Sequence, residues 1–170
     1  NALGREQAVA LAASLVSENF AAVWTSPLAR ALETARIVAQ ALHLPAPSAH
    51  EGLREKHFGA VQGVPKNELA ELNPALLEQI LRRNPAAEFV GGESMDEFAD
   101  RVIEAIEDIG NRHRGERVLV ITHGWVMDVV TRHIAGHARN AVLHIKRKNG
   151  ECVWVAVGKA IQAATDLPAE

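Results

Sequence analysis

Hydrophobic residues recur along most of the chain at the spacing of a helix face, and short apolar runs lie between these stretches. This period predicts helices over residues 3–19, 28–42, 67–83, 95–114 and 124–135. The helix over 67–83 is expected to break at Pro74, because proline removes a backbone hydrogen bond and clashes with the preceding turn. Ser94 and Glu97 have capping-box spacing, and Gly136 is a typical helix stop.

The short apolar runs predict strands over residues 20–25, 48–53 and 118–122, with a loop over 54–66. Two alternating runs, 141–148 and 151–157, meet at Asn149-Gly150, a dipeptide typical of hairpin turns. Strands that alternate with helices predict a three-layer α/β fold: a mostly parallel sheet flanked by helices, with an antiparallel hairpin at one edge. A chain of 170 residues is expected to form one domain, residues 1–170.

Charge and composition narrow the expected partners. The net charge of −3 argues against a surface that binds nucleic acid. No apolar run approaches the roughly 20 residues that a membrane helix needs. The single cysteine, Cys152, cannot form an internal disulfide, which suits a reducing compartment. We therefore expect a cytoplasmic protein with no nucleic-acid or membrane partner.

Three short segments carry candidate chemistry. His123-Gly124 follows a buried strand directly, at the edge where α/β sheets place their ligands. Arg30 lies in the first turn of a helix, where a guanidinium can bind phosphate beside free backbone N–H groups. Glu55 lies between cations in a loop and could donate and accept a proton. The alternatives are a structural histidine, an exposed surface arginine and a solvated charged loop.

Metal chemistry is not expected from this sequence. His133 and His137 are four residues apart, but Gly136 falls between them and no HExxH pattern is present. We expect neither a metal nor a cofactor.

Five stretches, taken in order, point to one family: LGREQA at 3–8, SPLARALETA at 26–35, LREKHFG at 53–59, GES at 92–94 and VITHG at 120–124. Each resembles a motif of the histidine phosphatase superfamily, also called the phosphoglycerate-mutase-like family. Asn1 stands where threonine is usual before the first motif. The resemblance covers nearly the whole chain, and its specificity comes from the order of the five motifs.

The resemblance implies a metal-independent phosphoryl transfer through a phosphohistidine. Carried over by motif, Arg30 binds the phosphoryl oxygens, Glu55 is the catalytic acid and base, and His123 is the second histidine of the pocket, both catalytic and phosphate-binding. Gly124 opens the helix beside the phosphate. As a weaker expectation, three further residues shape substrate specificity: Lys56, His57 and Trp125.

The family's R-H-G motif, whose histidine attacks phosphorus, has no counterpart in residues 1–170. We expect it upstream of Asn1, together with the first, central strand of the sheet, in roughly 30 residues. A chain that starts at Asn1 is expected to be inert by itself.

Three functions stay open at this point. The short segment 59–91 favours a small phosphatase, because related mutases carry a longer insertion there. Residues 55–59, EKHFG, are close to the mutases' E-R-H-Y-G, so a phosphoglycerate mutase is the first alternative. A phospho-ligand binding protein without turnover is the second. The expected partner is a small phosphorylated metabolite, and a homodimer is left open.

Overall fold

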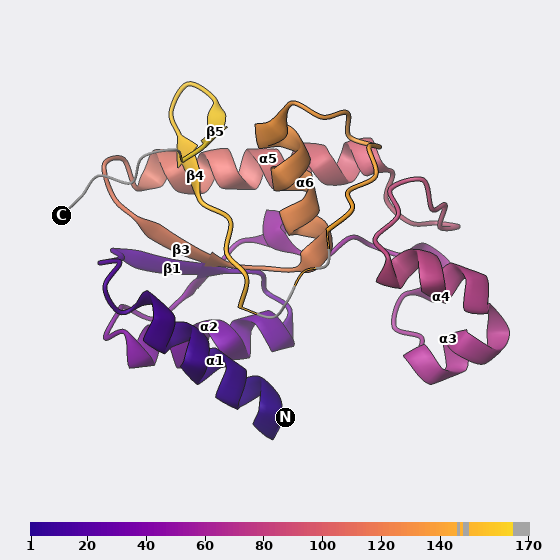
Figure 1. The fold of residues 1–170 in the computed structure, drawn as a ribbon, viewed down its shortest axis with the longest axis horizontal. Coiled ribbons are helices and arrows are strands. Elements are labelled where there is room, and N and C mark those ends of the chain that lie inside the picture. Colours follow the sequence, from indigo (N-terminus) through magenta and orange to yellow (C-terminus); the bar gives the residue numbers. More distant parts are fainter. Residues whose placement is uncertain (146, 148–149, 165–170) are drawn as a thin grey trace.

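The computed structural model describes residues 1–145, 147 and 150–164. A parallel sheet lies between two layers of helices (Figure 1). Its strands are β1 (Ala22–Thr25), β2 (Ser48–Ala49) and β3 (Val118–Ile121), in the order β2-β1-β3. The helices α1 (Ala2–Leu15) and α2 (Ala29–Ala41) cover one face, and α5 (Met95–Arg112) and α6 (Gly124–Ala135) cover the other. The predicted fold class is confirmed.

Alternation along the strands divides the core into two apolar clusters, one for each helical layer. Val23 and Leu119 are buried against residues of α1 and α2. Trp24 and Val120, one position later on each strand, pack against the cluster built by α5 and α6. Successive strand side chains point to opposite faces, so a sheet covered on both sides needs apolar residues at every position. This explains why the runs read as continuous rather than alternating.

The helix boundaries follow the expected signals. Ser94 and Glu97 form the capping box at the start of α5. Gly136 ends α6 in the left-handed conformation, with φ of 71°. The predicted break at Pro74 separates α3 (Lys66–Leu72) from α4 (Pro74–Leu81), and these two helices project from the body as a pair (Figure 1).

The structure changes the prediction at two places. The expected strand 48–53 ends after β2, and a short 3₁₀ helix, η1 (Glu51–Leu53), takes its second half. The expected hairpin 141–157 is also wrong in its pairing: β4 (Val155–Val157) pairs antiparallel with β5 (Ile161–Ala163), and residues 141–145 form no strand. Part of the predicted turn, residues 148–149, lies outside the described residues.

Burial explains the pairing that is observed. Ile161 is buried in the cluster built by α5 and α6, and Val155 and Val157 pack against it. By contrast, Val142 and Ile145 in the first predicted arm stay exposed. The pair β4–β5 forms a sheet of its own rather than an edge of the parallel sheet.

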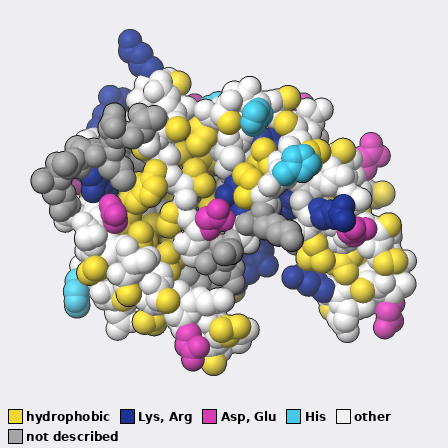
Figure 2. All heavy atoms as spheres, in the orientation of Figure 1, with side chains coloured by type: hydrophobic (Ala, Val, Ile, Leu, Met, Phe, Trp, Pro, Cys, Tyr) yellow, Lys and Arg dark blue, Asp and Glu magenta, His cyan; other side chains and the backbone are white. Residues whose placement is uncertain are grey.

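The β3 edge of the parallel sheet is open in the described part of the chain. There, β3 pairs with β1 on one side, and no described strand pairs with its other side. Hydrophobic side chains are visible on the face of the molecule between the two helical layers (Figure 2). An unpaired strand edge offers backbone donors and acceptors to a further strand. The expected upstream strand stays a prediction.

The loop after η1 is held against the turn before α5 by a close backbone contact at Gly59. Gly59 begins the short 3₁₀ helix η2 (Gly59–Val61) and has a φ of 61°. A Cβ at Gly59 would lie 2.0 Å from the Val90 carbonyl oxygen and 2.5 Å from the Gly92 nitrogen. Only glycine allows this approach.

We expect Gly59→Ala to destabilise the protein more than Gly63→Ala does. Both positions have positive φ, but nothing lies within 4 Å of a Cβ built at Gly63. The two variants therefore share the backbone strain, and only Gly59→Ala adds a clash, worth ~1–3 kcal/mol. Chemical denaturation of the two variants measures the difference in the free energy of unfolding. Equal losses would contradict the close contact.

Candidate active site

Parallel pairing of β1 with β3 brings two functional segments to one edge of the sheet. Thr25 is in register with Ile121, and the Ser26 N–H donates to the Ile121 carbonyl at 3.0 Å. The chain continues from β1 into α2, which carries Arg30, and from β3 into α6, which His123 precedes as its N-cap. Arg30 and His123 therefore meet although they are 93 residues apart.

The His123 ring has a partner on each nitrogen. The Arg30 Nη2 lies 3.3 Å from Nδ1, and the Ser26 Oγ lies 2.8 Å from Nε2. A guanidinium only donates, so Nδ1 must accept and Nε2–H must donate to Ser26. The Ser26 oxygen also accepts the Leu28 N–H at 3.2 Å. Leu28 is the N-cap of α2, and Ser26, two residues earlier, orients His123.

The environment keeps His123 neutral. Burial, with the nearby Arg30 and Arg101 guanidiniums acting in the same direction, lowers the pKa of its imidazole to about 4. A cation in a desolvated site beside other cations is unfavourable. At neutral pH His123 is therefore a hydrogen-bonding group rather than a charge.

Glu55 is placed at the start of α6 by two backbone donors. Its carboxylate accepts the Lys56 N–H at 3.1 Å and the backbone N–H of Trp125. The Thr122 Oγ1 donates to the Leu53 carbonyl at 2.9 Å, which ties this loop to the end of β3. The carboxylate of Glu55 therefore contacts the backbone N–H of Trp125, which lies two residues after His123 in the chain.

The pKa of Glu55 is raised to about 7, chiefly by burial. The two backbone N–H groups and the charges of Arg30 and Arg83 act in the opposite direction. A carboxyl group with this pKa exists in both protonation states near neutral pH, which suits a group that must donate and then accept a proton. The structure thus brings together a guanidinium, a neutral imidazole and a carboxyl group that can carry a proton.

Three weaker sequence candidates are placed around this centre. Lys56 is buried, and its ammonium donates to the Glu93 carbonyl and lies 5.0 Å from the centre of the Phe89 ring. The Trp125 side chain is buried against Phe58 and Phe89, so its backbone alone reaches the site. His57 is exposed. The roles of Lys56, His57 and Trp125 in substrate binding stay predictions. In the structure the side chains of Lys56 and Trp125 are buried and contact other residues of the protein.

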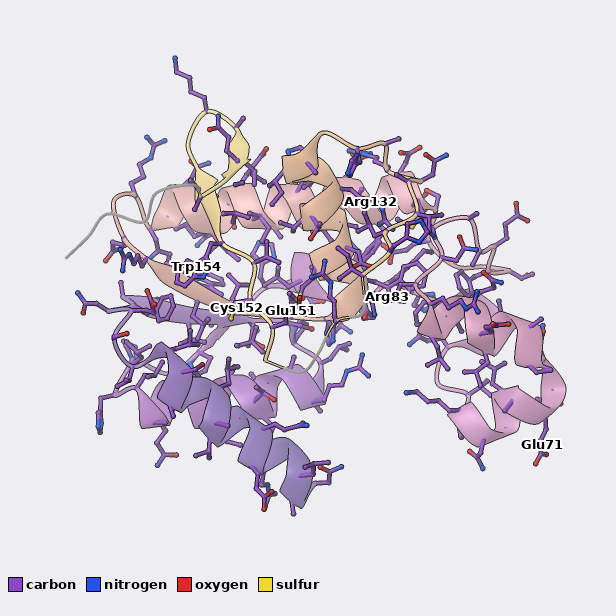
Figure 3. The ribbon with its side chains drawn as sticks, in the orientation of Figure 1. Glu71, Arg83, Arg132, Glu151, Cys152 and Trp154 are labelled. Atoms are coloured by element: carbon purple, nitrogen blue, oxygen red, sulfur yellow. The ribbon has the colours of Figure 1, made fainter. Side chains whose placement is uncertain are left out.

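Sequence reasoning missed Arg83, which reaches the site from the end of α4 (Figure 3). It lies over Gly124: a Cβ there would be 3.1 Å from the Arg83 Cδ. Its Nε donates to Asp128 at 2.7 Å, and Arg147 donates to the other oxygen of Asp128 at 2.8 Å. No spacing in the sequence relates Arg83 to α6, because tertiary packing alone brings them together.

Room for a ligand lies beside Glu55. A cavity of about 720 Å³ has Leu28, Glu55 and His57 in its wall, and Arg30 and His123 lie outside its lining. The described residues contain no cluster of three or more potential metal ligands. In that same part of the chain, no helix has the length and apolar character needed to cross a membrane.

A three-layer α/β fold with an arginine, a histidine and a carboxyl group at its strand ends is an arrangement suited to an anionic oxygen ligand. The chain belongs to the histidine phosphatase superfamily (branch 1), whose family model matches residues 1–164. The resemblance found in the sequence motifs is confirmed.

Similar proteins include phosphatases and mutase-like proteins. The chain is 37% identical over 152 residues to a metal-independent phosphoserine phosphatase of Arabidopsis thaliana, covering 85% of this chain and 64% of that protein. It is 36% identical over 129 residues to phosphoglycerate mutase-like protein 4 of the same plant, covering 75% and 56%. The chain thus spans less than two thirds of the length of these relatives. The structure of Bacillus stearothermophilus YhfR matches with a TM-score of 0.80 and 29% identity, covering 94% of this chain and 80% of that one.

We expect the His123 ring to stay neutral until the pH falls to about 4, well below its usual value of 6.5. Between these values the unfolded chain binds a proton that the folded protein does not, so His123 makes stability decrease as the pH falls. The imidazole C–H resonances of the protein, assigned with His123→Gln, give the midpoint directly. A midpoint near 6.5 would contradict the buried, cation-flanked environment.

Proposed function

We propose that the protein containing this chain hydrolyses small phosphate monoesters through a phosphohistidine intermediate. The nucleophilic histidine would come from an R-H-G segment upstream of Asn1. One observation carries this proposal: Arg30, neutral His123 and a Glu55 with a pKa of about 7 converge at one edge of the sheet. Each side chain matches a need of phosphoryl transfer.

Binding of the phosphoryl group uses Arg30 and His123. The Arg30 guanidinium can donate to two phosphoryl oxygens at once, which fixes the orientation of the group. The neutral imidazole of His123 accepts from Arg30 through Nδ1 and so helps to orient that guanidinium. The starts of α2 and α6 add backbone N–H groups and the positive ends of two helix dipoles. Positive groups that are fixed before the reaction stabilise the charge that develops on the transferring oxygens.

The first displacement then breaks the ester. A ring nitrogen of the upstream histidine attacks phosphorus, and the bond from phosphorus to the ester oxygen breaks. Protonated Glu55 gives its proton to that oxygen, so the alcohol leaves neutral. The cavity beside Glu55 offers room for the leaving group on that side.

The second displacement regenerates the site. Ionised Glu55 takes a proton from water as the water oxygen attacks phosphorus, and the bond between phosphorus and the histidine nitrogen breaks. Phosphate leaves and Glu55 is protonated again. No metal takes part in either step, in keeping with the name of the metal-independent phosphoserine phosphatase among the relatives.

A mutase is the second candidate, favoured by the 36% identity to phosphoglycerate mutase-like protein 4. In that reaction the phosphohistidine passes its phosphoryl group to a second hydroxyl instead of water. Incubation of the complete protein with 3-phosphoglycerate separates the two: free phosphate supports the phosphatase, and 2-phosphoglycerate supports the mutase.

Replacing Glu55 with glutamine should slow hydrolysis of alkyl phosphates ~10²–10⁴-fold, the usual worth of general acid catalysis. Nitrophenyl phosphate should lose much less, because nitrophenolate leaves without a proton. The wild type should also lose activity on alkyl phosphates as the pH rises through about 7, where Glu55 ionises, and the variant should lack this dependence.

Steady-state kinetics on both substrates across pH 5 to 9 test this expectation, with Glu78→Gln on α4 as the exposed control. A loss of the same size for both substrates would argue against Glu55 as the proton donor.

Chelation provides a separate check. We expect the complete protein to keep its activity on phosphate monoesters after dialysis against a strong chelator, because the proposed steps use side chains alone. Turnover of nitrophenyl phosphate before and after treatment is sufficient. Loss of activity that a divalent ion restores would rule out the proposed mechanism.

A further inference from the structure

Arg101, in the middle of α5, has every one of its side-chain donors engaged. A guanidinium carries five N–H groups. The Nε and one Nη2 hydrogen go to the two carboxylate oxygens of Glu93, at 2.6 and 2.7 Å. The other three hydrogens go to backbone carbonyls: those of Gly52 at 3.0 Å, Arg54 at 2.8 Å and Glu55 at 3.1 Å.

These backbone acceptors lie in the segment that leads up to and includes Glu55. Arg101 holds the carbonyls of residues 52, 54 and 55, and Thr122 holds the carbonyl of Leu53 between them. A loop has no ladder of backbone hydrogen bonds, so its carbonyls need partners from elsewhere. Four consecutive carbonyls are therefore fixed by two side chains, one from α5 and one from the end of β3.

Glu93 extends the same support beyond Glu55. One of its carboxylate oxygens accepts the His57 N–H at 2.8 Å, and its own N–H donates to the His57 carbonyl at 3.2 Å. The Lys56 ammonium donates to the Glu93 carbonyl. The charge of Arg101 keeps Glu93 ionised: together with the His57 N–H it holds the pKa of that carboxyl below its usual range, against the effect of burial.

The position of this network matters for chemistry because Glu55 must meet a leaving oxygen at hydrogen-bond distance. A displacement of about 1 Å in such a group can cost ~10²-fold in rate. Glu55 receives its own side-chain hydrogen bonds from the backbone of Lys56 and Trp125, so a shift of the loop backbone would move the carboxyl group relative to α6.

The geometry points to Arg101, acting with Glu93, as a positioning residue that holds the backbone of Glu55 so that its carboxyl group faces the leaving oxygen. This inference rests on the proposed phosphatase function. All five donors of Arg101 are engaged by Glu93 and by the loop carbonyls, so Arg101 has no free N–H for a reacting oxygen and acts through the loop. Lysine could not replace it, since an ammonium has three donors on one atom and cannot span five acceptors.

The test compares leaving groups in Arg101→Gln, Arg101→Lys and Glu93→Gln of the complete protein. For each, kcat/KM is measured with glycerol phosphate and with nitrophenyl phosphate on the same sample. The quantity compared is kcat/KM for glycerol phosphate divided by kcat/KM for nitrophenyl phosphate. This ratio does not depend on how much of the sample is folded, because the folded fraction cancels. Arg112→Gln serves as the matched control, since Arg112 lies on the same helix and its exposed side chain pairs with Asp108.

We expect Arg101→Gln to lower the ratio by ~10–100-fold, with Arg101→Lys intermediate and Arg112→Gln unchanged. The decline in activity above pH 7 should also weaken in Arg101→Gln. A ratio unchanged in all three variants, with both activities reduced equally, would overturn the inference and leave the phosphatase function standing. A wild type that hydrolyses neither ester would instead overturn the proposed function.

Discussion

The parallel pairing of β1 with β3 is the interaction on which the rest of the site depends. It places Ser26 and His123 just beyond the ends of two neighbouring strands, with the Ser26 N–H bonded to Ile121. Both segments then turn into helices, and the short hydrogen bond from His123 to Ser26 joins the starts of α2 and α6. A shift of one residue in this register would point the strand side chains to the wrong faces and separate Arg30 from His123.

Much of this arrangement could be predicted from the sequence, because the signals are local. Strand runs that are apolar at every position indicate a sheet covered on both faces, and Ser94, Pro74 and Gly136 mark helix boundaries through the chemistry of single residues. The motif resemblance selected Arg30, Glu55 and His123.

Long-range partners could not be predicted in this way: Arg83 and Arg101 lie in segments whose sequence is typical of an ordinary amphipathic helix surface. The hairpin failed for a related reason, since the Asn149-Gly150 signal is local, whereas burial of Ile161 among residues of α5 and α6 decides the pairing.

The site depends on one physical effect used twice with opposite results. Burial disfavours charge, so it lowers the pKa of a base and raises that of an acid. It makes His123 a neutral donor and makes Glu55 a carboxyl group that can keep its proton near neutral pH. The contributions to stability are opposite in sign. At His123 the unfolded chain holds a proton up to a higher pH than the folded protein, so this group makes stability rise with pH. At Glu55 the folded protein holds the proton up to a higher pH, so this group makes stability fall as the pH rises.

Cations around the site limit how far burial can act on Glu55. Desolvation alone would raise its pKa further; the backbone N–H groups of Lys56 and Trp125 oppose this most, and the charges of Arg30 and Arg83 oppose it as well. Arg83 can exert this effect because Asp128, buried in α6, holds it over Gly124, while Arg147 occupies the second oxygen of the same carboxylate. One carboxylate between two guanidiniums leaves an excess of positive charge on this side of the site. That excess favours an anionic substrate and also draws the pKa of Glu55 back toward neutrality. Under the proposed function, the same arginines that would attract a phosphate ester would therefore also help to set the pH at which its leaving group can be protonated.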